Sequence, residues 1–235
     1  MKGFDRPLKP EWIYKTIDVL EVGDTIYKKR DQIDDILVEL DGKTGKRKVI
    51  TVMGRYFLKD IDNSRGRKVT DNLIFNMIKE EPFERAKPLM LFNLLVKAPI
   101  LQKFSKEIYR NYSNKDIIDT NYLRDKAYHS IGERDIARRS LRNFLNTLVD
   151  FSLIEAEGNN YAWKDKYQVD EEMMVNFLKL YSKHYVDSPQ ISLLDLPKHI
   201  FFYFEIPDLM KLAQKYNNVH WNYVRRINAA LITMK

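Results

Sequence analysis

Arginine and asparagine side chains gather on one side of a single expected helix, within the segment ERDIARRSLRNFLNTLVDFSLI, residues 133–154. One side of this helix is apolar, because Leu141, Phe144, Leu145 and Leu148 recur at the spacing of a buried face. At about 100° per residue, the other side carries the polar residues Arg138, Arg139, Arg142, Asn143 and Asn146, with Arg134 just before the helix. Arginine bridges guanine O6 and N7 or grips phosphate, and asparagine pairs with adenine N6 and N7. The pattern therefore predicts a surface that binds duplex DNA.

A β-hairpin is expected directly after this helix. Residues 152–157 are typical of a strand, Gly158-Asn159-Asn160 indicates a turn, and residues 161–169 are typical of a returning strand. Lys164 and Lys166 fall on one face of that strand, opposite its aromatic residues. A turn at Gly132 and a supporting helix over residues 122–131 are expected before the arginine-rich helix.

A supporting helix, a turn, a second helix and a hairpin together resemble the winged helix-turn-helix superfamily over roughly 50 residues. The resemblance implies that the second helix enters the major groove and that the hairpin tip touches the phosphate backbone, a role that Lys164 and Lys166 would fill. Winged helices also serve as protein-docking modules, and exposed arginines often form only a solvated surface. Glu155 and Glu157 on the expected hairpin would repel phosphate.

A second basic patch lies in the N-terminal region. Residues 41–68 carry nine basic and three acidic side chains, a balance of +6, and the patch includes Arg65, Arg67 and Lys68. Two basic loops, around residues 43–48 and 62–66, would hold phosphates beside a duplex or would simply be solvated, and both interpretations stay open.

Composition sets the wider limits. The chain has 235 residues, 44% of them hydrophobic, a net charge of +7 and no cysteine. A disulfide framework and a thiolate metal site are excluded. Glycine and proline are scarce, at eight each, which favours helices. No apolar stretch is long enough to span a bilayer, so we expect a soluble, cytoplasmic protein without a membrane partner.

The periodicity predicts a mainly α-helical chain in three regions. These are an N-terminal helical region with basic loops (1–82), a winged helix-turn-helix with a β-hairpin wing (83–169) and a C-terminal helical region (170–235). Asp170 and Asp208 are expected to start helices. The aromatic run over residues 200–204 is expected in the core.

The C-terminal half is also similar to the small helical A component of BREX phage-defence systems. The residues that carry this similarity are ARRSLRNFLNTLVDFSLI, VDEEMMVNFLKLYSKHY, FFYFEIPDLMKLAQKYN and HWNYVRRI. The similarity implies a helical, DNA-binding protein that is not an enzyme and that is an accessory factor in phage defence. A regulator is the other DNA-binding role that we consider.

Features of catalysis are sparse in the sequence. The four histidines are dispersed without metal-ligand spacing, and no nucleophile elbow or dinucleotide loop occurs. We therefore expect no catalytic residue, no metal and no cofactor. A protein-interaction module within a larger complex and, less favoured, a metal-dependent nuclease are the alternatives.

Overall fold

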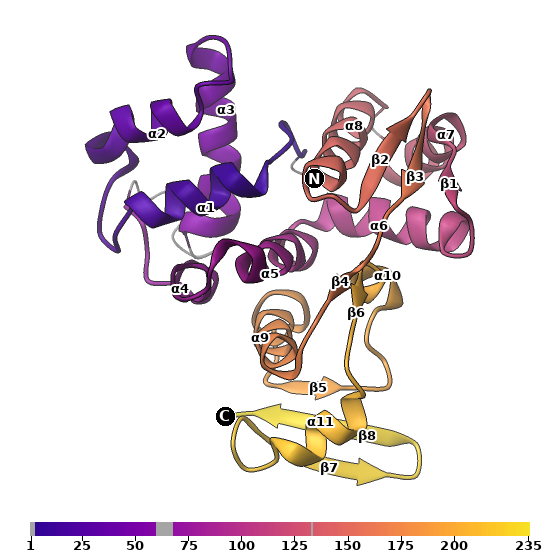
Figure 1. Ribbon diagram of the computed structural model, residues 1–235. Helices are drawn as coiled ribbons and strands as arrows, with labels where there is room; N and C mark the ends of the chain where they lie inside the picture. Colours follow the sequence, from indigo (N-terminus) through magenta and orange to yellow (C-terminus); the bar gives the residue numbers. More distant parts are fainter. Residues whose placement is uncertain (1–2, 60–67, 133) are drawn as a thin grey trace.

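The protein is mainly helical, with small sheets, as a computed structural model of the chain shows (Figure 1). The structure describes residues 3–59, 68–132 and 134–235, without the side chain of Arg134. Within these residues, no helix is both long enough and apolar enough to cross a lipid bilayer.

The N-terminal region is a group of short helices. They are α1 (Pro10–Val19), the 3-10 turn η1 (Ile26–Lys29), α2 (Arg30–Ile36), α3 (Lys43–Met53), the π-helical turn η2 (Gly54–Leu58) and α4 (Leu73–Glu80). The prediction of a basic loop at residues 43–48 is wrong, since these residues begin α3. Val49, Val52 and Met53 bury one face of that helix, and tertiary packing outweighs the two glycines nearby. The helix α4 is capped by Asn72, because Asn72 Oδ1 accepts from Phe75 N at 3.2 Å.

The central helix α5 (Phe83–Lys97) is buried on every side from Leu89 to Val96. It packs against α1, α4, α6 (Pro99–Tyr112) and α9 (Glu171–Tyr181), which belong to all three regions expected from the sequence. One hydrophobic core consequently runs from Phe4 to Ile232.

The segment after α6 consists of two helices flanked by short strands. It contains β1 (Ile117–Ile118), α7 (Thr120–Ile131), α8 (Arg134–Asp150), β2 (Ile154–Glu157) and β3 (Asn160–Trp163). The three strands form an antiparallel sheet in the order β1-β3-β2. The expected strand over residues 161–169 is interrupted: β4 (Tyr167–Gln168) leaves this sheet and pairs in parallel with β6 (Phe204–Glu205).

The C-terminal region mixes helices with a second antiparallel sheet. Its remaining elements are the π-helical turn η4 (Ser182–Val186), β5 (Gln190–Ser192), α10 (Lys198–Phe201), α11 (Leu209–Lys215), β7 (Trp221–Arg226) and β8 (Ala229–Met234). Asp170 and Asp208 cap α9 and α11 as predicted. The wholly helical prediction is wrong for the last residues, because β7 and β8 form a hairpin whose sheet order is β5-β8-β7. Trp221, Ala230 and Ile232 are buried on one face of this sheet, which holds it against the core.

Candidate nucleic-acid interface

Helix α8 has three distinct faces. Leu141, Phe144, Leu145 and Leu148 are buried in the core, as the sequence predicts. Ser140, Asn143 and Thr147 form a second face that is buried although it is polar. The third face, a stripe covering roughly 100° of the helix surface, is exposed and carries Arg138, Arg139, Arg142 and Asn146, which we call the arginine stripe.

The buried polar face is covered by the N-terminal segment of the chain, residues 3–8. Phe4 N donates to Ser140 Oγ at 2.9 Å, and Leu8 N donates to Thr147 Oγ1 at 3.0 Å. Asn143 Nδ2 donates to Phe4 O at 2.7 Å, and Asn143 is only 6% exposed. The prediction that Asn143 faces a ligand is therefore wrong: its amide is buried and donates to the backbone carbonyl of Phe4.

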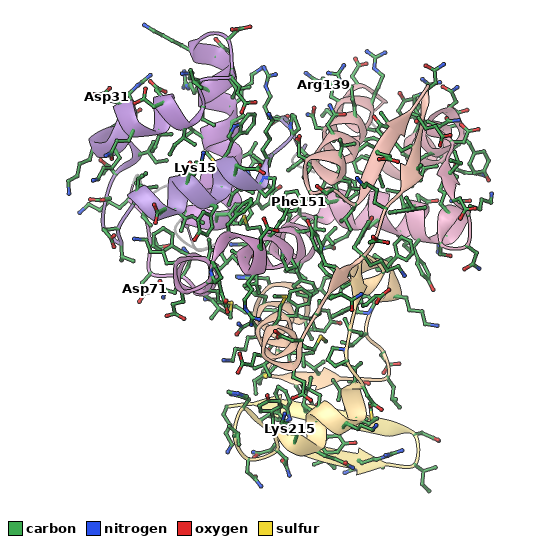
Figure 2. The ribbon with its side chains drawn as sticks, viewed as in Figure 1. Lys15, Asp31, Asp71, Arg139, Phe151 and Lys215 are labelled. Carbon is green, nitrogen blue, oxygen red and sulfur yellow. The ribbon has the colours of Figure 1, made fainter. Side chains whose placement is uncertain are left out.

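The arginine stripe has little competition from the protein's own carboxylates. Arg138 Nη2 lies 4.0 Å from Asp135 Oδ1, and the two side chains are 67% and 87% exposed. An exposed pair at this distance holds an arginine weakly. Arg139 Nε makes a long contact, 3.4 Å, with the carbonyl oxygen of Asp135. Figure 2 shows Arg139 at the outer edge of the molecule. These guanidinium groups are thus accessible to an external anion.

A groove of about 560 Å³ lies between α7 and α8, and four arginines line it. Arg124 of α7 joins Arg138, Arg139 and Arg142 there, and Tyr161 of β3 closes one side. The start of α7 is fixed to the hairpin because Thr120 N donates to Asn160 Oδ1 at 3.3 Å. Asp119 Oδ1 also accepts from Tyr122 N at 3.0 Å, which caps the helix. The groove therefore presents a concentrated positive charge on well-anchored helices.

Arg124 was missed by the sequence prediction. It lies in the expected supporting helix, for which the sequence predicted no ligand contact. Leu123 and Ala127 mark the buried face of that helix, and the residue next to Leu123 lies at the edge of this face. An arginine at the edge of a buried face, on the helix expected to pack against the arginine-rich helix, is the feature of the sequence that indicates this position.

The hairpin of β2 and β3 does not place its lysines at the tip. Glu157 pairs with Asn160 next to the turn, where Gly158 has φ +60°, whereas Ile154 pairs with Trp163 at the other end. Lys164 and Lys166 follow Trp163 and so lie at the base. The expectation that they contact phosphate from the tip is wrong.

Both lysines have neighbours at that base. Lys164 Nζ lies 3.5 Å from Glu155 Oε2, and Lys166 Nζ lies 4.9 Å from the centre of the Phe202 ring. Glu155 and Glu157 are exposed, as the sequence suggested. The tip therefore bears an acidic rather than a basic side chain.

The remaining predicted residues lie apart from the groove or outside the description. Lys68 is exposed in the N-terminal region, and its backbone forms an isolated antiparallel bridge with Thr25. Arg65 and Arg67 lie outside the described residues, and so does the side chain of Arg134.

Neither a metal centre nor a related protein guides the assignment. Within the described part of the chain, no three His, Cys, Asp or Glu side chains are grouped so that they could hold a metal ion. Comparison with protein-family models, characterised proteins and solved structures found no significant match.

Proposed function

We propose that this protein is a non-enzymatic, duplex-DNA-binding protein that uses a winged helix-turn-helix. The order α6–β1–α7–α8–β2–β3, with the sheet order β1-β3-β2, supports this assignment. In such a domain α8 is the recognition helix, and α7 is the helix that supports it.

The observation that carries the proposal is the convergence of four arginines on one groove. Arg124, Arg138, Arg139 and Arg142 come from two helices, and the ion pairs of Arg124 with Asp125 and of Arg138 with Asp135 are long, at 3.9 and 4.0 Å. Phosphate attraction supplies most of the sequence-independent affinity of DNA-binding proteins. The candidates for base contacts share the exposed stripe of the recognition helix, and they are Arg138, Arg139, Arg142 and Asn146.

The acidic hairpin favours contact through the helices rather than through the wing. Glu157 next to the turn would repel a phosphate, and Lys164 is already beside Glu155. We therefore assign the duplex to the surface of α7 and α8.

The proposal is tested by replacing Arg138, Arg139 and Arg142 with alanine together. Duplex binding is measured by mobility shift across a series of salt concentrations. Each arginine that contacts a base should cost about 1–3 kcal/mol, and each lost phosphate contact should lower the salt slope by about one. We expect the triple variant to lose most of its affinity and to show a shallower salt dependence.

A charge-matched control uses Lys211, Arg225 and Arg226, which are exposed in the C-terminal region. Their triple alanine variant has the same net charge and should keep its affinity within about threefold. Unchanged binding in the α8 variant, or an equal loss in both, contradicts the proposal. Absence of duplex binding at low salt, together with co-purification of another protein, would instead identify an interaction module.

The biological role that we propose is an accessory factor of a phage-defence system of the BREX type, with a regulator as the alternative. The similarity of residues 138–235 to the small helical A component supports the first role. A regulator must prefer a particular DNA sequence, so selection from a randomised pool of duplexes distinguishes the regulator from the accessory factor. Strong enrichment of one motif favours the regulator, and uniform binding favours the accessory factor.

A further inference from the structure

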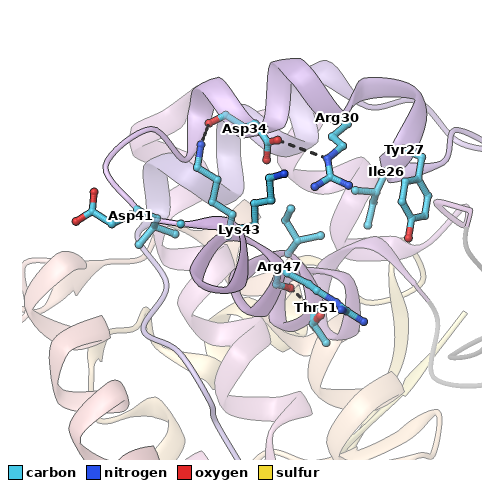
Figure 3. Close-up of a pocket in the computed structure, with 12 residues that line it drawn as sticks. Ile26, Tyr27, Arg30, Asp34, Asp41, Lys43, Arg47 and Thr51 are labelled. Carbon is cyan, nitrogen blue, oxygen red and sulfur yellow. Dashed lines mark hydrogen bonds and ion pairs between the residues drawn. The ribbon is translucent and has the colours of Figure 1, made fainter.

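A second cavity lies in the N-terminal region, away from the arginine groove. It has a volume of about 830 Å³ and lies between α3 on one side and η1 with α2 on the other (Figure 3). A cavity of this size is typical of small-molecule sites, which range from about 300 to 1,000 Å³.

Four basic side chains line this cavity, from two elements. Arg30 comes from α2, and Lys43, Lys46 and Arg47 come from α3. Two of them contact Asp34. The Asp34 carboxylate oxygen Oδ2 lies 3.5 Å from Arg30 Nε, and the Asp34 backbone carbonyl oxygen accepts a hydrogen bond from Lys46 Nζ at 2.6 Å. Asp41 points away from the basic groups in Figure 3.

Lys43 and Arg47 remain available for a ligand. Both are exposed, and among the described residues no carboxylate lies within 4.0 Å of either charged group. Among the described residues, the cavity therefore has an excess of positive charge.

The position of these cations on α3 is unfavourable for the helix alone. Its first turn has no acidic residue, and Gly42 before it provides no side-chain cap. Cations at this end oppose the helix dipole, whereas an anion there is stabilised by it. A bound anion would offset the repulsion among Lys43, Lys46 and Arg47.

The cavity also offers apolar surface next to its cations. Ile26, Leu40 and Ile50 are partly buried along it, and Tyr27 is 67% exposed at its edge. An exposed aromatic ring is a surface on which a base can stack. Inorganic phosphate alone would leave this half of the cavity unused.

We propose that this cavity binds a nucleoside phosphate. Lys43 and Arg47 bind the phosphates, and the base lies against Tyr27 and Ile26. This site is made of elements separate from α7 and α8, so it does not depend on the proposed DNA-binding function.

The test is calorimetric titration of the full chain with ATP, inorganic pyrophosphate and adenosine at low salt. ATP should bind more tightly than pyrophosphate, and adenosine more weakly than both. Replacing Lys43 and Arg47 together with alanine should weaken ATP binding at least tenfold. Tyr27→Ala should weaken ATP binding several-fold and leave pyrophosphate binding within twofold.

Lys48→Ala is the matched control, since Lys48 is an exposed lysine of α3 that does not line the cavity. Its ATP affinity should stay within twofold. Failure of ATP to bind at millimolar concentration, or an equal loss in the Lys48 variant, overturns the proposal. An unchanged ATP affinity in Tyr27→Ala overturns the assignment of a nucleoside.

Duplex binding of the Lys43 and Arg47 variant separates this site from the DNA surface. We expect its affinity for duplex to stay within threefold. If duplex and ATP binding fall together, the cavity is part of the DNA surface and the separate nucleotide site is refuted.

Discussion

Asn143 and Asn146 lie three residues apart on α8 and have the same side chain with different roles. The Asn143 amide donates to the carbonyl oxygen of Phe4, and its side chain is buried. Asn146 is exposed on the arginine stripe. The first asparagine fixes the N-terminal segment, and the second is available to a base.

Alanine substitutions at these two positions separate stability from binding. Asn143→Ala leaves the Phe4 carbonyl without its partner and should cost about 1–2 kcal/mol in the free energy of unfolding. In a chain of this size, each kcal/mol lowers the melting temperature by about 2–4 °C. The folded variant should keep its affinity for duplex.

Asn146→Ala is the converse variant. It should change the free energy of unfolding by less than about 0.5 kcal/mol and weaken duplex binding. Thermal denaturation and mobility shift measure both effects. A stable Asn143 variant that loses duplex binding would show that Asn143, and not only Asn146, serves the ligand.

At the scale of elements, α8 ends on a carboxylate in an unfavourable position. Burial, with a smaller contribution from nearby Glu11 and Glu39, raises the pKa of Asp150 to about 6, and Lys9 acts in the opposite direction. The amino group of Lys9 is paired with Glu39. The negative end of the helix dipole also disfavours a carboxylate here. Ionised Asp150 therefore destabilises the fold.

Asp150→Asn should stabilise the protein at pH 8. The folded protein binds the proton more tightly than the unfolded chain, so wild-type stability should rise as pH falls from above 6 towards 4. One pKa unit corresponds to about 1.4 kcal/mol. Because Asp150 is only partly buried, solvent screening should reduce the gain in the variant to about 1–2 kcal/mol.

Urea denaturation at pH 8, 6 and 4 measures this effect. The advantage of the variant should shrink through pH 6 and vanish near pH 4. A gain that is constant with pH would mean that the carboxylate charge is not its cause. Asp18→Asn, at an exposed position of α1, is the control, and its effect on stability should be the same at the three pH values.

At the scale of the whole molecule, α5 joins the three expected regions into one core. Phe92 is fully buried on this helix, stacked on Phe177 with ring centres 4.0 Å apart. Phe201 and Phe204 complete the cluster at 5.2 and 5.8 Å. A residue that contacts α9, α10 and β6 at once should affect the entire chain.

Phe92→Ala should destabilise the protein by about 3–5 kcal/mol. Unfolding should remain one transition, because the core is continuous. The fluorescence of one tryptophan reports on each region: Trp12 on the N-terminal, Trp163 on the central and Trp221 on the C-terminal region. Variants that keep only one of these tryptophans should show the same melting temperature. Leu194→Ala, at a side chain that is 58% exposed, should change stability by less than about 0.5 kcal/mol. Separate melting of the three tryptophans would show independent domains.

Much of the local structure was predictable from the sequence. The apolar face of α8, the exposure of Arg138, Arg139 and Arg142, and the caps at Asp170 and Asp208 agree with their predictions. The aromatic run at residues 200–204 lies mostly in the core, as expected. These features depend on side chains within a turn or two of one another, so the pattern of residue types is enough to specify them.

Other features of the candidate site depend on contacts between distant segments. Asn143 is buried by residues that precede it by more than 130 positions, and Arg124 meets the stripe only because α7 packs on α8. Likewise, Lys43 begins a helix and residues 221–234 form a hairpin because neighbouring elements bury one face of each. The residue types alone determined which side chains are able to bind a polyanion. Tertiary packing decided which of them remain exposed, since burial depends on the whole chain and not on the local repeat.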